Sequence, residues 1–134
     1  MPFFYRVGTG IGDVTDTAVG LPLQGMADQR QRATGVESHL YARAFLLADP
    51  TTHACVAIVV ADIWSGTRRV KDGVIRRLAR LPGTPFAEEN VLLAGTHTHS
   101  GPGGFSGHRF YDYTDGGCVR PWWRASWRVV DRLV

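Results

Sequence analysis

The distribution of apolar and polar residues along the chain predicts several strands and one helix. Residues 39–48 and 53–61 are apolar segments rich in strand-forming residues, and the turn sequence Asp49-Pro50-Thr51-Thr52 separates them. This arrangement predicts an antiparallel hairpin. Residues 90–95 are a further apolar run that is typical of a buried strand. A short additional strand is expected over residues 3–7.

Residues 67–81 show the spacing of an amphipathic helix. One face of that helix is apolar, with Val70, Val74, Leu78 and Leu81, and the solvated side is basic, with Arg69, Lys71, Arg76, Arg77 and Arg80. Pro82-Gly83 then ends the helical pattern. Because an apolar strand precedes this helix and another follows it, residues 53–95 predict a βαβ unit. The two strands of such a unit end at the same edge of the sheet, so Asp62 and His97 are expected to emerge there together.

The glycine-rich segment near the N-terminus is interpreted as a loop. Three alternating glycines in residues 8–12 form a Gly-x-Gly-x-Gly pattern, but a dinucleotide-binding fingerprint should open a helix with hydrophobic periodicity. Here the glycines lead instead into residues 13–22, whose Asp, Thr, Gly and Pro content favours loops. Residues 17–36 show no clear period and predict a long irregular loop, a kind of segment that is often functional.

The strongest candidate for chemistry is the sequence Thr96-His97-Thr98-His99-Ser100-Gly101-Pro102-Gly103-Gly104, which directly follows the apolar run 90–95. In an extended chain, residues i and i+2 point to the same side roughly 6–7 Å apart, so His97 and His99 are expected to share one face. The glycines that follow let the backbone turn and approach a ligand closely. Two imidazoles at a strand end beside such a loop are typical of a metal or catalytic site.

Simpler roles for these residues remain open from the sequence. A His-x-His pair also occurs by chance, and either ring could cap a loop carbonyl. The hydroxyl of Ser100 could orient a ring or a bound water. Asp62 could hold a metal-bound histidine, or it could make the hydrogen bonds of a turn or helix entry. The sequence therefore predicts the position of a site, but it leaves more than one chemical role open for these residues.

Composition narrows the functional classes. A chain of 134 residues with 44% hydrophobic content is one domain or part of one, and it can bury a core. The formal net charge of +3 depends on four arginines within the last fifteen residues, so nucleic-acid binding has little support. Cys55 lies in an apolar run and Cys118 in a glycine-rich segment, which does not suggest a disulfide framework. No apolar run approaches the ~18 residues of a transmembrane segment, and residues 1–6 lack a signal-peptide pattern, so the compartment stays open.

Five motifs, taken in their order along the chain, resemble one known family. They are Val7-Gly8-Thr9-Gly10-Ile11-Gly12-Asp13-Val14-Thr15, Gln24-Gly25-Met26, Ala42-Arg43-Ala44-Phe45, Ala61-Asp62-Ile63 and, as the most specific block, residues 90–104. In these motifs the chain resembles the N-terminal part of the neutral/alkaline (non-lysosomal) ceramidase family. The resemblance covers roughly residues 5–115.

This resemblance implies a zinc-dependent amidase that cleaves ceramide, a membrane lipid, into sphingosine and a fatty acid at a membrane surface. It implies that His97 is a zinc ligand, that His99 is a catalytic residue near the reacting carbonyl, and that Gly101, Gly103 and Gly104 let the backbone approach the substrate. Asp62 and Ser100 are expected to support the histidines. The family's other zinc ligands and its active-site serine lie beyond the stretch that this chain resembles. Because a catalytic zinc takes about three protein ligands plus water, we expect this chain alone to be inactive.

The expected fold class is α/β, with a partial mixed β-sheet that contains a βαβ unit, as a fragment of a larger zinc-hydrolase catalytic domain. Residues 1–118 are expected to be the ceramidase-like segment, and residues 119–134, rich in Trp and Arg, an atypical tail that a shifted reading frame would explain. Such a fragment leaves apolar faces uncovered and is expected to aggregate without a partner. Two alternatives remain open: a non-catalytic lipid- or partner-binding module, and a fragment of another His-x-His metallohydrolase.

Overall fold

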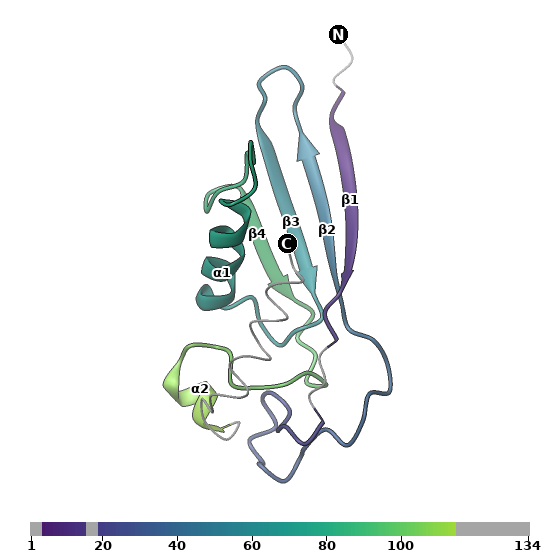
Figure 1. Cartoon of the computed structure of the whole chain (residues 1–134), viewed down its shortest axis with the longest axis vertical. Coiled ribbons are helices and arrows are strands. Elements are labelled where there is room, and N and C mark those ends of the chain that lie inside the picture. The colour runs from purple at the N-terminus through teal and green to yellow at the C-terminus, as the bar shows by residue number, and fades with distance from the viewer. Residues whose placement is uncertain (1–3, 16–18, 115–134) are drawn as a thin grey trace.

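A four-stranded mixed sheet is the centre of the computed structural model, which describes residues 4–15 and 19–114 (Figure 1). The elements in chain order are β1 (Arg6–Asp13), β2 (Tyr41–Ala48), β3 (Cys55–Ala61), α1 (Arg68–Leu78), β4 (Val91–Gly95) and α2 (Arg109–Thr114). The strands lie in the order β1-β2-β3-β4. β2 pairs antiparallel with both β1 and β3. β3 pairs parallel with β4, and α1 connects these two strands. This topology confirms the predicted hairpin, the βαβ unit and the mixed sheet.

β1 begins later and runs further than predicted. Residues 4 and 5, which were predicted to be strand, lie before it, and the prediction of a loop from residue 8 onward was wrong for residues 8–13. Gly8, Gly10 and Gly12 alternate with larger residues along the strand and pair with β2, for example Gly10 opposite Ala44. No heavy atom lies within 4 Å of the position that a Cβ of Gly10 would take. The period of two, which is the signature of a strand, was present in the segment, but the glycine content masked it.

α1 is shorter than predicted because it begins one residue later and ends three residues earlier. Thr67 is its N-cap, and the Thr67 hydroxyl accepts from the amide of Val70 at 3.4 Å. Val70 and Val74 are buried as predicted, and Leu78 packs at the edge of the core. Leu81 lies past the helix end and is 48% exposed, so its predicted place on the packed face was wrong.

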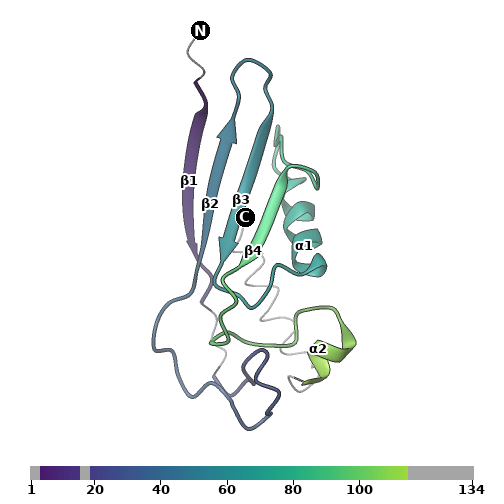
Figure 2. The ribbon, with the colours of Figure 1, turned by 180° about the vertical axis from the view of Figure 1, so that it is seen from behind.

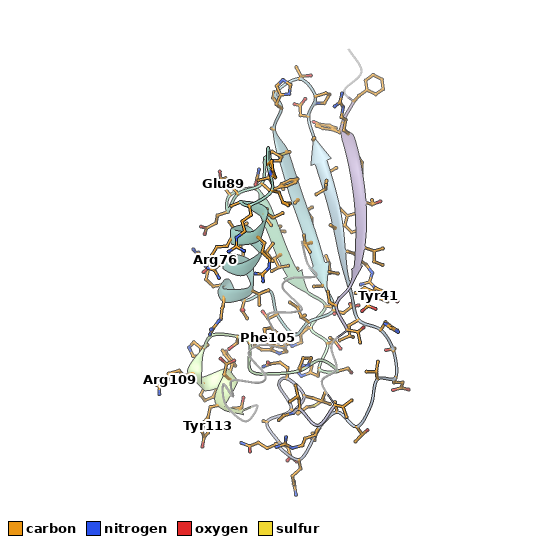
Figure 3. The ribbon with its side chains drawn as sticks, viewed as in Figure 1. Tyr41, Arg76, Glu89, Phe105, Arg109 and Tyr113 are labelled. Carbon is orange, nitrogen blue, oxygen red and sulfur yellow. The ribbon has the colours of Figure 1, made fainter. Side chains whose placement is uncertain are left out.

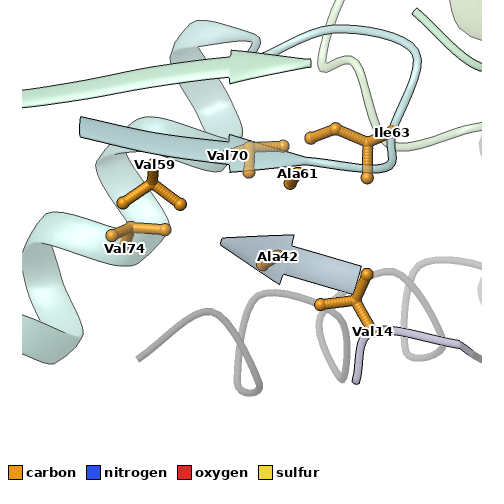
Figure 4. Packing of buried hydrophobic residues seen from close by; sticks show 7 residues of the cluster. All are labelled: Val14, Ala42, Val59, Ala61, Ile63, Val70 and Val74. Carbon is orange, nitrogen blue, oxygen red and sulfur yellow. The ribbon is translucent and has the colours of Figure 1, made fainter. Parts of the chain in front are cut away.

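The core lies between α1 and one face of the sheet. Its buried residues are Val14, Ala42, Val59, Ala61, Ile63, Val70 and Val74 (Figure 4). Small and β-branched side chains dominate this set, which lets the helix lie close to β3 and β4. Seen from behind, the described residues place no helix in front of the strands (Figure 2). The two faces of the sheet are therefore unequally covered.

The loops that matter for function gather where β3 and β4 end (Figure 1). The predicted irregular segment is confirmed for residues 19–36, which make only isolated bridges, Pro22 to Arg32 and Leu23 to Pro102. Phe105 lies between the end of the sheet and α2 and packs against the core (Figure 3). Within the described ranges, neither helix is long and apolar enough to cross a membrane. The predicted tail, residues 119–134, and the boundary at residue 118 lie outside those ranges.

Candidate active site

His97 emerges at the end of β4 beside the end of β3, as predicted for a βαβ unit. The amide of Thr96 donates to Ala61 O at 2.9 Å, and the amide of His97 donates to Ile63 O at 3.1 Å. The strand itself ends at Gly95, and His97 has φ +65, in the left-handed region. A non-glycine residue rarely adopts that conformation unless surrounding contacts hold it. The connection that follows β3 therefore fixes the backbone of His97.

The two histidine rings lie together, although the extended geometry used to predict this does not occur. Their centroids are 5.1 Å apart and the rings are nearly perpendicular, at 85°. The left-handed turn at His97 interrupts the strand geometry that would place residues i and i+2 on the same side. The proximity of the two rings therefore has another cause. Each ring is held by its own hydrogen bond to a separate part of the chain.

Both rings are bound through Nδ1 to a backbone carbonyl. Nδ1 of His97 lies 3.0 Å from Trp64 O, and Nδ1 of His99 lies 2.8 Å from Gln24 O. A carbonyl oxygen can only accept, so each Nδ1 carries the proton and each neutral ring keeps a lone pair on Nε2. Histidines that bind metals commonly donate their other ring N–H in this way. Capping a carbonyl and presenting a ligand nitrogen are thus compatible roles here.

Aromatic side chains border the histidine pair on one side. The ring centroid of Trp64 lies 5.7 Å from that of His97 and 5.3 Å from that of Tyr111. Trp64 and Tyr111 also line an open groove of about 820 Å³ between α1 and the loop before α2, with Arg69 and Arg76 among its walls. Trp64 therefore contributes both the carbonyl that orients His97 and a wall of the adjacent groove.

Residues 22–25 are a supporting segment that sequence reasoning missed. The backbone N–H of Gln24 donates to Gly101 O at 3.0 Å, and the backbone N–H of Gly103 donates to Pro22 O at 3.2 Å. Gln24 is 1% exposed, and among the described residues its Oε1 has no hydrogen-bond partner. This segment thus holds the chain on both sides of Pro102 as well as the ring of His99.

Gly25 leaves the space that the His99 ring occupies. It has φ +75, and a Cβ at this position would lie 2.6 Å from Cε1 and 2.7 Å from Nδ1 of His99. The motif Gln24-Gly25-Met26 had been noted only as one part of a family resemblance. No local pattern connects it with a histidine 75 residues later, so only the fold reveals the contact.

The three glycines predicted to contact the substrate are buried, and two of them are hydrogen-bonded to this supporting segment. Gly101, Gly103 and Gly104 are all buried, and Gly104 has φ +83. In the described residues, Gly101 and Gly103 bring the backbone close to residues 22–24. Approach of the same glycines to a substrate stays a prediction.

Asp62 does not make the predicted contact with a histidine in the described residues. Its carboxylate accepts from the Tyr41 amide at 2.8 Å and from Arg43 Nη1 at 3.1 and 3.2 Å. Burial raises the pKa of Asp62, but the hydrogen bonds from Tyr41 and Arg43 outweigh it, so the pKa lies below its ordinary value of 3.8. Asp62 therefore ties the end of β3 to the start of β2, and backbone carbonyls orient the rings in its place.

Ser100 directly follows the histidine pair in the sequence. Its amide donates to the Thr98 hydroxyl at 3.2 Å, and no hydrogen bond within the described ranges joins its own hydroxyl to either ring. Ser100 borders a separate cavity of about 260 Å³, together with Leu40 and Pro102. Its predicted role toward a ring or water stays a prediction.

The donor set fits part of a zinc site. Zinc accepts imidazole nitrogen, and the Nε2 atoms of His97 and His99 are the available donors. Within the part of the chain that the structure describes, no three His, Cys, Asp or Glu residues come together as a metal-binding group. The residues described here therefore supply at most two of the roughly three protein ligands that a catalytic zinc takes.

Comparison with known proteins gives the same result for sequence and for fold. Residues 5–129 match the family described as neutral/alkaline non-lysosomal ceramidase, N-terminal. The chain is 37% identical over 130 residues to a neutral ceramidase of Mycobacterium tuberculosis, covering 96% of this chain and 20% of that protein. It is 37% identical over 131 residues to a neutral ceramidase of Pseudomonas aeruginosa, covering 97% and 19%.

A crystal structure of the neutral ceramidase from Pseudomonas aeruginosa superposes with a TM-score of 0.88 and 33% sequence identity. The match covers 100% of this chain and 21% of that one. The chain thus spans about a fifth of the length of the relatives it matches. The sheet, the histidine loop and the supporting segment described above lie within the matched residues. On these grounds the chain belongs to the neutral/alkaline non-lysosomal ceramidase family.

Proposed function

We propose that this chain supplies the two-histidine part of a zinc-dependent ceramidase site, which hydrolyses the N-acyl amide bond of ceramide to sphingosine and a fatty acid. The observation that carries the proposal is the pair of hydrogen bonds that hold Nδ1 of His97 and of His99 on backbone carbonyls. In its neutral form each ring then offers the lone pair of Nε2, and the two ring centroids lie 5.1 Å apart. Family membership supplies the substrate class, because the relatives are named neutral ceramidases.

His97 is the proposed zinc ligand, as the resemblance to the family implies, and two hydrogen bonds fix its position. Its amide and its ring both bind the connection between β3 and α1, at Ile63 O and Trp64 O. A fixed ring loses little freedom when it binds a metal. When bound, zinc would lower the pKa of its water to about 7 and polarise the amide carbonyl of the substrate.

His99 is the proposed catalytic residue that handles a proton near the reacting carbonyl. Its Nδ1–H donates to Gln24 O, so its Nε2 is the atom that can accept a proton. Ceramide lies in membranes, so the complete enzyme must meet a lipid surface. Because about four fifths of a relative's length lies outside the match, the proposed activity belongs to the completed catalytic domain, and the chain alone is expected to be inactive.

A chimeric ceramidase tests this function. It is the Pseudomonas aeruginosa neutral ceramidase with its matched segment replaced by this chain, and zinc content and ceramide hydrolysis are measured separately. We expect His97→Ala to lose both zinc and hydrolysis, and His99→Ala to lose hydrolysis by at least a hundredfold while it keeps zinc. His53→Ala, an exposed histidine at the hairpin turn, is the control and is expected to change neither.

Three results would contradict this proposal, each in a different part. A His97→Ala chimera that keeps its zinc and its hydrolysis contradicts the ligand assignment. A folded chimera that binds lipid vesicles but hydrolyses no ceramide favours the alternative of a non-catalytic lipid-binding module. Substantial ceramide hydrolysis by the isolated 134-residue chain contradicts the view that further residues complete the site.

A further inference from the structure

The groove beside the candidate active site is strongly cationic. It has a volume of about 820 Å³ and lies between α1 and the segment that leads into α2, two helices on the same side of the molecule (Figures 1 and 2). Three arginines line it, Arg68, Arg69 and Arg76, but among the described residues its walls include only one carboxylate, that of Asp72. A hollow of this volume is large enough for a small-molecule ligand.

The carboxylates nearest to these arginines are bound by Arg68. Its Nε lies 2.8 Å from Asp72 Oδ1, and its Nη1 lies 2.8 Å from Glu88 Oε1. The described lining still carries a net positive charge, to which Arg69 and Arg76 contribute. A guanidinium group presents planar N–H donors that match a carboxylate or a phosphate. The charge of the groove therefore favours an anionic ligand.

The first turn of α1, which borders the groove, carries charge of the sign that helices disfavour there. The positive end of the helix dipole is stabilised by acidic residues, but this turn has none and instead begins with Arg68 and Arg69. A bound anion would offset both the dipole and the two side chains. The helix end thus favours the same kind of ligand as the arginines in the groove wall.

The loop before α2 holds Arg69 in that wall. Gly107 has φ +77, and a Cβ at this position would lie 2.7 Å from Cδ and 3.1 Å from Cβ of Arg69, so the stem of Arg69 lies against the Gly107 backbone. The backbone N–H of Gly107 donates to Asp112 Oδ2 at 3.1 Å, and Asp112 is buried. A buried carboxylate therefore anchors the loop that positions Arg69.

Two aromatic rings give the groove an apolar wall. Trp64 and Tyr111 both line it, and their ring centroids lie 5.3 Å apart. Trp64 also lies beside His97, with ring centroids 5.7 Å apart, so the groove borders the candidate active site at this residue. Aromatic rings provide a large apolar surface for hydrocarbon, and the arginines provide donors for an anion. Together they favour an anionic amphiphile.

We propose that this groove binds the carboxylate of the fatty acid that ceramide hydrolysis releases, an inference that rests on the proposed function. In that reaction water attacks the acyl carbon, the C–N bond breaks, both protons of the water end on the amine, and the acyl group leaves as a carboxylate. The amide of ceramide is uncharged, so the arginines favour the product over the substrate. The groove thus takes the product from the vicinity of His97.

Binding of decanoate to the chimeric ceramidase tests the site without any need for activity. Zinc is first removed with a chelator, so that a carboxylate bound to the metal does not contribute, and titration calorimetry gives the Kd. Decanol has the same hydrocarbon chain without the charge. We expect decanoate to bind about tenfold more tightly than decanol, as a charge-assisted hydrogen bond to an arginine implies.

Charge-removing variants locate the binding. Arg69→Gln and Arg76→Gln are each expected to weaken decanoate binding about tenfold and to leave decanol binding unchanged. Glutamine keeps the stem carbons that pack against Gly107, and Arg76→Lys, which keeps the charge, should retain most of the affinity. Arg80→Gln removes the same charge from an exposed arginine beyond α1 that does not line the groove, and this matched control is expected to change neither affinity.

Three results overturn the proposal. Equal weakening in the Arg80→Gln control would mean that only the net charge matters. Equal affinities for decanoate and decanol would mean that hydrocarbon alone is bound. Binding to phosphatidylglycerol vesicles without measurable binding of decanoate would assign the groove to a phospholipid headgroup.

The same chimera separates the groove from the proposed function. If it binds decanoate in the expected charge-dependent way but hydrolyses no ceramide, the groove is supported as a carboxylate site and the proposed function is contradicted. If it hydrolyses ceramide while neither Arg69→Gln nor Arg76→Gln alters decanoate binding, the groove is not the product site and the proposed function stands.

Discussion

The βαβ unit and the loops at its end are built by different means. In the βαβ unit, residues 55–95, neighbours in sequence pack against each other, and buried valines join α1 to the sheet. At the end of the sheet, residues 22–25 and 97–103 come from distant parts of the chain and are joined by backbone hydrogen bonds. The first region is held by apolar burial, and the second by polar contacts that set positions.

This difference assigns the two regions different tasks. The βαβ unit fixes where the chain leaves β4, and the loops then determine which way each histidine ring points. The regions meet at Gly95, where the last residue of β4 lies against the connection from β3 to α1. Substitutions at the junction should therefore disturb both regions, whereas substitutions within one should leave the other largely intact.

Gly95→Ala is expected to have the largest effect on stability, because Gly95 lies where the two regions meet. A Cβ at Gly95 would lie 2.6 Å from Ile63 O and 3.0 Å from the Ser65 backbone, and backbone atoms cannot move aside as a flexible side chain can. We expect a loss of about 3 kcal/mol or more in the free energy of unfolding, measured by urea denaturation of the chain at low concentration.

Gly10→Ala is the matched control for that substitution. It also adds a methyl group to a strand glycine, but no heavy atom lies within 4 Å of the new Cβ. We expect a change within about 1 kcal/mol, in the stabilising direction. Similar losses at the two glycines would show that the junction is not especially tight.

Gly25→Ala tests whether the supporting segment positions His99. The new Cβ would lie 2.6–2.7 Å from two atoms of the ring, so the ring must move off Gln24 O. Because a displacement of about 1 Å in a catalytic group can cost a hundredfold in rate, we expect at least that loss of ceramide hydrolysis in the chimeric ceramidase.

Gly20→Ala separates this effect from backbone strain. Gly20 has φ +84, close to the φ of +75 at Gly25, but a Cβ there meets no atom within 4 Å. Both variants should lose about 1–2 kcal/mol of stability from the left-handed conformation, and Gly25→Ala should lose about 1 kcal/mol more because the His99 ring also leaves Gln24 O. Only Gly25→Ala should lose hydrolysis, and equal activities in the two variants would refute the positioning role.

The βαβ unit could be predicted from the sequence because its signals are local. Val70 and Val74 lie on one helical face, and the apolar runs on either side have the length of strands. The position of the histidine loop followed from that unit. The support of His99 by Gln24 and Gly25 could not be predicted, because it depends on two loops meeting across 75 residues. β1 was missed in part because its glycines resemble loop chemistry.

Val74→Ala tests the βαβ unit itself. Val74 is 2% exposed and belongs to the core cluster with Val59 (Figure 4). Removing two buried methyl groups should lower the free energy of unfolding by about 2 kcal/mol. Val36→Ala, on a 51% exposed valine in the irregular loop, should change it by less than about 0.5 kcal/mol. Urea denaturation of both variants provides the measurement, and equal effects would contradict a core centred on α1.

Asp62→Asn is expected to have the smallest effect and the most specific one, because it acts through pH. The pKa of Asp62 lies below 3.8 in the folded chain, since hydrogen bonds from Tyr41 and Arg43 outweigh the effect of burial. A carboxyl whose folded pKa is lowered contributes stability above its unfolded pKa and loses it as pH falls through the folded value.

The wild-type chain should therefore be more stable than Asp62→Asn by about 1 kcal/mol near neutral pH, where the carboxylate binds Arg43. Below about pH 4 the difference should shrink as Asp62 takes up a proton. Thermal unfolding of both proteins from pH 7 down to pH 2.5 measures it. The asparagine amide can still accept from the Tyr41 backbone, so the strand ends stay joined and only the charge is removed. A constant difference across this range would mean that Asp62 acts through shape rather than charge, and the junction would then owe its stability to packing alone.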